Sequence, residues 1–419
     1  MHQTFRRTEI LIPQGVDMEK WSVVACDQFT AQPEYWAARE RESAGVPSAL
    51  HLMLPEAYLA ERDPIAEAEK INAEMDRYLA GGVFRTLPDS FVYVERTLSS
   101  GAVRRGLVGA LDLEDYDFSP DSGTPVRATE GTVAARLPAR VKVREGASLE
   151  MPHVMVFLDD PENAVLGGVD AEKSSLEPLY DFDLSAGGGH LRGWRVTGAE
   201  ADGVDAALAK IAEAAAARSG AKAPVVFAMG DGNHSLATAK RCWETLKPGL
   251  SEAERETHPA RFSLVELVNI HDPAVTFEPI HRVIFNTRPA EFYASVSAAF
   301  SAVSRAHLNR HTLRLATPEG EWTVSVGGLT IGQVIDTAED ACRHYIDMRG
   351  GELDYIHGDE TALEMGRRPG CAALLLPRME KGELFPSVEQ SGPFPRKSFS
   401  IGHAEDKRYY LECRRIRRN

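Results

Sequence analysis

Six consecutive residues, 230–235, carry the clearest chemical signal in this sequence. They follow a short apolar run at 225–229 and precede a segment, 236–246, in which apolar residues recur at helical spacing. A strand that turns over glycines into a helix directs the first N–H groups of the helix at the turn, where they bind phosphate or carboxylate groups. The predicted phosphate-binding residues are Gly230, Asp231, Gly232, Asn233, His234 and Ser235. An ordinary strand-to-helix connection, capped by Asp231 or Asn233, has the same pattern and stays open as an alternative.

Two carboxylates are candidates for general-base or metal-ligand chemistry. Asp27 follows a short predicted strand, 23–25, and Glu130 lies in a cluster that also holds Arg127 and Thr132. A carboxylate at a strand end can accept a proton or bind Mg²⁺, and a cation beside hydroxyl groups can bind phosphate. We expect Asp27 and Glu130 to be the catalytic residues and the Mg²⁺ ligands, with Arg127 and Thr132 contacting phosphate. The alternative is that Asp27 forms a turn and that the cluster around Glu130 is a polar loop.

Two further pairs of residues place polar and charged side chains at predicted strand or loop ends. His281 and Arg282 follow an apolar run, and Lys397 and Ser398 follow a proline and an arginine near the C-terminus. Lys397 is a candidate phosphate ligand, because an ammonium group offsets phosphate charge. His281, Arg282 and Ser398 are further candidates. A surface pair and a charged loop are the alternative interpretations.

Strand and helix patterns are mixed throughout the chain, which predicts an α/β fold with a mixed sheet. The strongest local signals are an amphipathic helix at 65–79, a β-hairpin at 91–113 and an alanine-rich helix at 204–218. We expect residues 1–285 to form a nucleotide-binding region around the strand-turn-helix at 225–246. Residues 286–419 are expected to form a C-terminal α/β region that packs back on the cleft.

Composition narrows the class of protein. The chain has 419 residues and a formal net charge of −15, from 47 Lys and Arg against 62 Asp and Glu. This balance argues against a nucleic-acid partner, because the phosphate backbone attracts basic surfaces. The five cysteines are widely spaced and predict neither a disulfide framework nor a structural zinc site. With no signal-peptide core and no apolar run near the ~20 residues of a membrane span, we expect a cytoplasmic protein that acts on a small molecule. A homo-oligomer is compatible with the sequence.

The familiar nucleotide motifs are missing, but weaker motifs occur in a recognisable order. There is no phosphate-binding P-loop, no complete Gly-x-Gly-x-x-Gly fingerprint and no protein-kinase catalytic loop. The weaker motifs include Pro178–Phe182, Trp194–Val196, Gly230–Ser235, Pro279–Val283 and Pro395–Phe399. In this order they resemble a large prokaryotic family known as a conserved domain of unknown function, which carries an Asp-Gly-His-His-Arg motif. That motif is similar to one in the ParB and sulfiredoxin-like superfamily, which includes archaeal free-serine kinases.

The resemblance implies a ParB/sulfiredoxin-like nucleotide-binding core with additional α/β elements. It also implies phosphoryl transfer from ATP or ADP, with Mg²⁺, to a small hydroxyl compound, and L-serine is the leading acceptor. This sequence has Asn233 and Ser235 where the family motif has a histidine and the arginine. Loss of that arginine removes a bidentate phosphate contact, which Arg127, Arg241 or Lys397 could replace.

We therefore expect a small-molecule kinase in which residues 230–235 hold the phosphates and Asp27 or Glu130 orients the acceptor hydroxyl. The alternative is a non-catalytic nucleotide-binding regulatory protein of the ParB-like type. An acidic pair at the phosphate turn distinguishes the two hypotheses, because a kinase uses it and a binding protein does not need it. A metal-dependent hydrolase is a third hypothesis. The histidines that would then converge with carboxylates are His153, His234 and His281.

Overall fold

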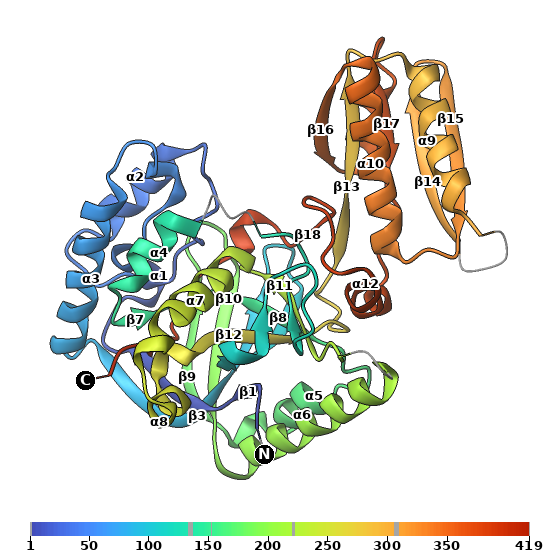
Figure 1. Ribbon diagram of the computed structural model, residues 1–419. Helices are drawn as coiled ribbons and strands as arrows, with labels where there is room; N and C mark the ends of the chain where they lie inside the picture. The colour runs from blue at the N-terminus through green and yellow to red at the C-terminus, as the bar shows by residue number, and fades with distance from the viewer. Residues whose placement is uncertain (1, 133–136, 152, 220–222, 306–309, 419) are drawn as a thin grey trace. The chain divides into compact units, whose positions relative to one another are not determined.

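The chain forms two compact units (Figure 1). The computed structural model describes residues 2–132, 137–151, 153–219, 223–305 and 310–418. Unit 1 comprises Met1–Ala128, Thr132–Val275 and Gly402–Asn419, and unit 2 comprises Thr129–Gly131 and Thr276–Ile401.

Unit 1 is built on a mixed sheet in which eleven strands of the described residues take part. The main order is β5-β6-β11-β8-β12-β4-β3-β10-β9, with β1 paired to β4 and β2 to β3. β6 is parallel to β11 and β8 is parallel to β12, whereas the long hairpin β3–β4 is antiparallel. The strands are β1 (Phe5–Arg6), β2 (Thr8–Pro13), β3 (Phe84–Thr97), β4 (Val103–Asp112), β5 (Tyr116–Asp117), β6 (Val126–Arg127), β8 (Met155–Leu158), β9 (Glu177–Asp183), β10 (His190–Val196), β11 (Phe227–Asp231) and β12 (Phe262–Asn269). A separate two-stranded sheet joins β7 (Leu149–Glu150) to β19 (Arg414–Arg415).

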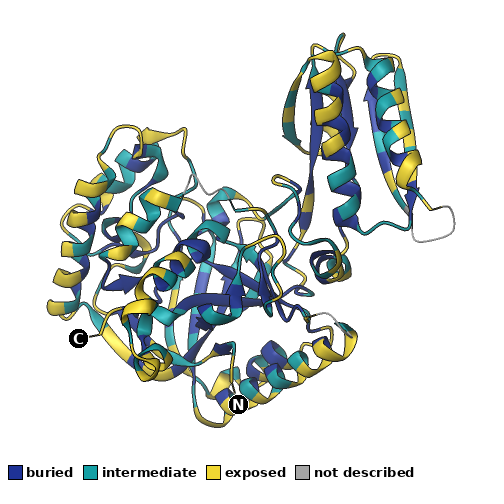
Figure 2. Cartoon of the chain, in the orientation of Figure 1, coloured by how far each residue is buried: buried dark blue, intermediate teal, exposed yellow. Residues whose placement is uncertain are grey.

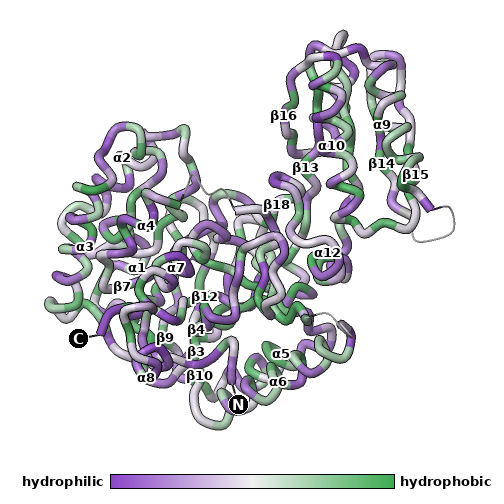
Figure 3. Tube along the Cα trace, viewed as in Figure 1, coloured by the Kyte–Doolittle hydropathy of each residue, from purple (hydrophilic) through white to green (hydrophobic). Residues whose placement is uncertain are grey.

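Helices cover both faces of this sheet, because alternate residues of a strand point to opposite sides. In β3, Val92 and Val94 belong to one buried cluster, and Phe91 and Tyr93 belong to another. Figure 2 shows the strands largely buried, with exposed residues on the outer faces of the helices, and Figure 3 shows apolar residues concentrated where the elements pack together. The helices of unit 1 are α1 (Met18–Trp21), α2 (Pro33–Glu42), α3 (Pro64–Ala80), α4 (Leu137–Glu145), α5 (Ala164–Ala171), α6 (Gly198–Ser219), α7 (Asn233–Leu246) and α8 (Glu252–Thr257).

Helix α7 packs against the sheet through the apolar stripe that its sequence predicts. Leu236, Ala239 and Trp243 are buried in one cluster with residues of β8, β11 and β12. Leu246 is 41% exposed, so the buried stripe ends one turn before the end of the helix. Burial of a large side chain such as Trp243 stabilises the helix position by several kcal/mol, on the order of 3–5 when measured by truncation to alanine.

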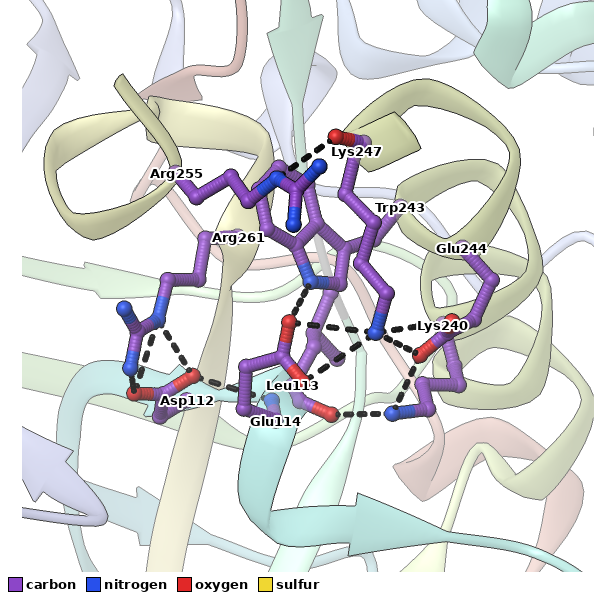
Figure 4. A network of polar contacts seen from close by, with 9 residues as sticks. All are labelled: Asp112, Leu113, Glu114, Lys240, Trp243, Glu244, Lys247, Arg255 and Arg261. Carbon is purple, nitrogen blue, oxygen red and sulfur yellow. Dashed lines mark hydrogen bonds and ion pairs between the residues drawn. The ribbon is translucent and has the colours of Figure 1, made fainter. Parts of the chain in front are cut away.

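Polar contacts fix the C-terminal half of α7 (Figure 4). Trp243 Nε1 donates to Glu114 Oε1 at 2.7 Å, and Lys240 Nζ donates to the Leu113 carbonyl at 2.8 Å. Lys247 Nζ also contacts both carboxylate oxygens of Glu114, at 3.3 and 3.2 Å. With this half held in place, the N-terminal end of α7 has a defined position beside β11.

Unit 2 contains a second sheet, of six strands among the described residues, in the order β15-β14-β17-β13-β16 with β18 beside β13. Its strands are β13 (Phe277–Phe285), β14 (Arg310–Thr317), β15 (Gly320–Gly327), β16 (Glu352–His357), β17 (Ala372–Leu375) and β18 (Phe399–Ile401). Its helices are α9 (Pro289–Val303), α10 (Ile331–Arg349), α11 (Asp359–Gly366) and α12 (Leu384–Ser391). Helices α9 and α10 lie side by side against the sheet (Figure 1).

The mixed α/β class expected from the sequence is confirmed. The strand predicted at 23–25 is wrong, because Val24 forms only an isolated bridge, to Arg408. So short an apolar run does not make a strand without a longer partner beside it. None of the helices in the described ranges is long and apolar enough to cross a membrane.

The division into units differs from the expected boundary at residue 286. Residues 277–285 form β13, which pairs with β16 and β17 and therefore belongs to unit 2. Residues 402–419 belong to unit 1, because they pair with its N-terminal segments, as at Leu11 and Cys413. The packing of the C-terminal region on the cleft stays a prediction.

Candidate functional site

The strand-turn-helix predicted at 225–246 is present, and its turn depends on glycine. The pairing of β11 with β8 shifts register between Met229 and Asp231, which places a β-bulge at Gly230. Bulges redirect the neighbouring side chains and are common beside functional sites. Gly232 follows with φ +78°, and a Cβ there would lie 3.0 Å from the Val154 Cα atom. Any other residue would therefore be strained and crowded at this position.

The end of α7 nearest this turn has the electrostatic character of an anion site. The first helical hydrogen bonds run from the N–H groups of Ser235 and Leu236 to the Gly232 carbonyl, at 2.9 and 3.0 Å. The aligned peptide dipoles give a helix N-terminus a partial positive charge. Asp231 Oδ1 accepts the Gly232 N–H at 2.8 Å and so stabilises the turn itself.

A guanidinium from another helix contacts the first turn of α7. Arg140, in α4, donates from Nη1 to Ser235 Oγ at 3.2 Å. Its Nη2 lies 3.8 Å from Asp27 Oδ2, and its Nε donates to Glu56 Oε1 at 3.2 Å, with a second, shorter bond from Nη2 to the same oxygen. The Arg140 side chain is only 14% exposed. Arg140 thus joins Asp27 to Ser235, the position at which the family motif has an arginine.

A second cation reaches the turn from the C-terminal segment. The Ala25 N–H donates to the Lys407 carbonyl at 2.8 Å, so residues around 407 run beside residues 23–25, just before Asp27. Lys407 Nζ lies 3.2 Å from Asp231 Oδ2. Two cations, Arg140 and Lys407, and three carboxylates, Asp27, Glu56 and Asp231, therefore gather at the glycine turn.

Asp27 is a carboxylate at neutral pH. Burial raises its pKa, but electrostatic interactions with His153, Arg140 and Lys407 and a hydrogen bond from Gln28 Nε2 at 3.0 Å lower the pKa to about 2. A carboxylate with so low a pKa is a weak proton acceptor. It is better suited to orienting a hydroxyl group or binding a cation.

His153 is a buried polar side chain beside Asp27. Its side chain is 2% exposed, and its Nε2 lies 3.9 Å from Asp27 Oδ1. Neither ring nitrogen has a hydrogen-bond partner among the described residues. The ring packs edge-on against Tyr409, whose hydroxyl donates to Cys26 Sγ at 3.2 Å. Burial raises the pKa of the Cys26 thiol to about 11, so it is protonated at neutral pH.

A cavity of about 160 Å³ lies beside these residues in unit 1. Glu56, Arg140, His153, Ser235 and Tyr409 form part of its wall. Much of the remaining wall is apolar and comes from the segments around 52–54, 143–151 and Met75 of α3. The N-terminal end of α7 therefore borders a space large enough for a small molecule.

The sequence at residues 11–336 matches the model of a family described as a protein of unknown function, DUF1015. The chain belongs to the DUF1015 family. The family membership expected from the order of the motifs is thereby confirmed. No curated protein matches this DUF1015 chain.

Several solved structures resemble this DUF1015 protein at low sequence identity. A conserved hypothetical protein from Pyrococcus furiosus is 9% identical, with a TM-score of 0.33, covering 74% of this chain and 94% of that one. Free serine kinase in complex with AMP is 10% identical, with a TM-score of 0.35, covering 74% and 90%. SbnI with a C-terminal truncation, from Staphylococcus aureus, is 8% identical, with a TM-score of 0.34, covering 70% and 82%. These weak similarities concern the fold alone.

In the DUF1015 chain, the other predicted phosphate ligands have varied surroundings. Arg127 donates from Nε to the Thr124 carbonyl at 3.1 Å and from Nη2 to the Ala223 carbonyl at 2.7 Å, which holds two segments of unit 1 together. Thr132 Oγ1 and Asn233 Oδ1 are buried with no hydrogen-bond partner among the described residues. The His234 carbonyl accepts from Thr238 Oγ1 at 2.7 Å.

Glu130 and Lys397 lie together in unit 2. The Lys397 N–H donates to Glu130 Oε1 at 2.7 Å, and Lys397 Nζ lies 4.8 Å from the centre of the Tyr355 ring. Ser398 Oγ donates to the Pro395 carbonyl at 2.5 Å and closes the same turn. Because Asp27 belongs to unit 1, a Mg²⁺ site shared by Asp27 and Glu130, and a phosphate contact from Lys397, stay predictions.

His281 and Arg282 have partners inside unit 2. His281 is 1% exposed, accepts the Leu376 N–H at 3.2 Å and contacts Asp359 Oδ1 at 3.1 Å. Arg282 is fully buried and donates to Glu339 Oε2 at 3.1 Å. These contacts place both side chains in the packing of unit 2, where they anchor β13 within its sheet.

Sequence reasoning did not single out Arg140, Glu56 or Lys407, and it considered His153 only as a metal ligand. None of these residues lies in a recognisable local motif, so spacing alone could not have found them. Among the described residues, the one group of three side chains close enough to share a metal ion is His2, Asp112 and Asp115, which no sequence motif indicates.

Proposed function

We propose that this DUF1015 protein is a nucleotide-dependent kinase that phosphorylates a small hydroxyl compound, with L-serine as the first acceptor to test. The observation that carries the proposal is the position of Arg140, 3.2 Å from Ser235 Oγ and 3.8 Å from Asp27 Oδ2. This cation connects the anion-binding end of α7 to a carboxylate that can orient an acceptor. A site for phosphoryl transfer needs both.

The phosphates of the nucleotide bind at the glycine turn in this proposal. Backbone N–H groups at the start of α7 and the helix dipole favour an anion there. Arg140 and Lys407 offset the remaining phosphate charge, and Arg140 takes the part of the arginine that the family motif has at Ser235. Such fixed groups stabilise the charge of the transition state because they need not reorganise during the reaction.

In the reaction, the hydroxyl oxygen of the acceptor attacks the terminal phosphorus of ATP or ADP. The bond from that phosphorus to the bridging oxygen breaks, and the shortened nucleotide departs with the bonding electron pair. Asp27 orients the hydroxyl group, and the proton passes to solvent as the new bond to phosphorus forms. Phosphoryl transfer depends mainly on positioning and charge stabilisation, so a weakly basic carboxylate is adequate for this role.

The residues present also fit a Mg²⁺ ion. Mg²⁺ takes oxygen ligands and is usually bound through one or two carboxylates together with substrate phosphates. Asp27 and Asp231 would hold it, since Lys407 Nζ lies 3.2 Å from Asp231 Oδ2 and its charge also lowers the pKa of Asp27. When bound, the ion would neutralise phosphate charge.

The test is a phosphoryl-transfer assay that is monitored by ³¹P NMR. It uses ATP or ADP as the donor, Mg²⁺, and serine, threonine, homoserine, glycerate or inositol as the acceptor. We expect transfer by the wild-type protein. The Asp27→Asn variant should lose about 10²-fold or more in turnover while still binding nucleotide, because the change removes the charge that orients the acceptor. Asp63→Asn is the matched control, since Asp63 caps α3 through the Ile65 N–H.

Nucleotide binding without any transfer across the panel would instead favour the regulatory protein of the ParB-like type. In that case Asp27→Asn would change the nucleotide affinity by no more than the control variant does. Absence of both binding and transfer would overturn the proposal altogether.

A further inference from the structure

The cavity beside the glycine turn has two chemically different ends. The end formed by Arg140, Glu56, His153 and Ser235 is polar. The other end is lined mainly by apolar side chains, among them Leu52, Met53, Met75, Val143, Leu149 and Met151, and also by the ion pair of Arg144 with Glu150. All of these residues belong to unit 1.

The cavity is an open pocket rather than a closed void, and apolar side chains form much of its wall. A ligand that covers such a wall gains about 25 cal/mol for each Å² of apolar surface removed from water. At about 160 Å³, this cavity holds on the order of ten water-sized groups. An occupant with roughly ten non-hydrogen atoms would fill it, and L-serine alone would leave the apolar end without a partner.

His153 gives the polar end a buried hydrogen-bonding group with nothing to bind in the protein. Its side chain is 98% buried, since 2% of it is exposed, and both ring nitrogens lack a partner among the described residues. Buried polar atoms in native proteins are nearly always satisfied, so an orphaned pair calls for a ligand or water. The imidazole lines the cavity, 3.9 Å from Asp27, where an acceptor hydroxyl has to be oriented.

We propose that the cavity is the acceptor subsite and that the acceptor is a hydroxy compound with an apolar group next to its hydroxyl. The hydroxyl binds His153 and Asp27 at the polar end, facing the phosphate turn. The apolar group extends toward Met75 and Leu149. This inference rests on the proposed kinase function and specifies its substrate class.

A homologous series of acceptors tests the inference by binding alone. L-Serine, L-threonine, L-3-hydroxyleucine and L-3-phenylserine share one amino-acid head and one hydroxyl, and they differ in the apolar group. Calorimetric titration without nucleotide should show affinity rising about fourfold from serine to threonine, the factor for one buried methyl group. The gain should exceed about tenfold for 3-phenylserine.

Two variants test whether this gain in affinity arises from binding in the cavity. Ala147 lines the cavity wall, so Ala147→Leu should remove most of the gain of 3-phenylserine over L-serine. His153→Phe keeps a ring but removes both nitrogens, and it should weaken every member of the series by about tenfold. Leu208→Ala, in the other buried cluster of unit 1, is the control and should change no affinity. Thermal melts confirm that each variant is folded.

The outcomes separate this inference from the kinase proposal. If affinity rises along the series in the wild-type protein and no longer rises in Ala147→Leu, the subsite is supported even when no phosphoryl transfer is found. Affinity that is flat or falls along the series, or no binding of any member, overturns the subsite even if serine is phosphorylated. A gain that persists in the Ala147→Leu variant also overturns it.

Discussion

Replacing Arg140 by methionine tests the most connected side chain of the phosphate site. Methionine keeps much of the apolar stem and removes the charge. The wild-type guanidinium donates to Ser235 Oγ at 3.2 Å and to Glu56, and it lies 3.8 Å from Asp27. If it also binds a nucleotide phosphate, one charge-assisted hydrogen bond worth about 1.5–3 kcal/mol is lost. That loss corresponds to nucleotide affinity weaker by about 10- to 150-fold.

The same change should also lower the free energy of unfolding. It leaves the carboxylates of Glu56 and Asp27, whose side chains are 14% and 21% exposed, without their main cation. Breaking a fully buried pair costs about 3–5 kcal/mol, and residual solvent contact reduces the expected cost here to roughly 2 kcal/mol. The double variant Arg140→Met/Glu56→Gln should recover part of this stability and none of the nucleotide affinity.

The assay is calorimetric titration of ADP and ATP, with urea unfolding of the same samples. Arg144→Met is the matched control, because Arg144 lies one turn further along α4 and donates to Glu150 Oε2 at 2.6 Å. It loses a comparable ion pair but has no described contact with Ser235. Nucleotide affinity unchanged in Arg140→Met, or reduced equally in Arg144→Met, would refute the assignment of Arg140 to the phosphate site.

Three other changes examine the turn and its charges. Lys407→Met, which removes the partner of Asp231, should weaken nucleotide binding more at low than at high salt, and titrations that show no salt dependence would contradict this. Gly232→Ala should lower the free energy of unfolding by roughly 1–3 kcal/mol, because of the positive φ and the close approach of Val154, and a urea midpoint equal to wild type would count against the turn geometry. Asp27→Asn should be less stable than wild type by about 2 kcal/mol at pH 7, because the folded-state pKa of Asp27 is about 2 and its ordinary value is 3.8. This contribution to stability is present above the pKa of the unfolded state and disappears as pH falls through the pKa of the folded state. The stability difference between wild type and Asp27→Asn should therefore narrow by about 1 kcal/mol between pH 6 and pH 3 in urea titrations, and a constant difference would argue against this role of Asp27.

The glycine turn could be predicted because its causes are local. The glycines at 230 and 232 and the apolar residues at helical spacing in α7 lie in one short segment and are visible in the sequence, and the bulge and the positive φ that the structure shows fall on those glycines. The long hairpin β3–β4 and the helices α3 and α6 could be predicted for the same reason. Period and turn chemistry act over a few residues.

The short run at 23–25 shows where local reasoning stops. Its residues are apolar and read as a strand, yet only a bridge between Val24 and Arg408 forms. The partner comes from the last residues of the chain, and strand formation requires a neighbour that supplies hydrogen bonds along its length. The boundary between the units has the same origin, because β13 follows its partners β16 and β17 into unit 2.

By itself the sequence determined the strand-turn-helix, the mixed α/β class and the family, since each of these depends on residue order and local spacing. The tertiary structure alone decided which charges surround the turn. Arg140 from α4 and Lys407 from the C-terminal segment converge there with Asp27, although nothing in their own neighbourhoods distinguishes them from other charged residues. Coulombic and hydrogen-bond energies depend on distances in space, and those distances are set only when the sheet and its covering helices have packed.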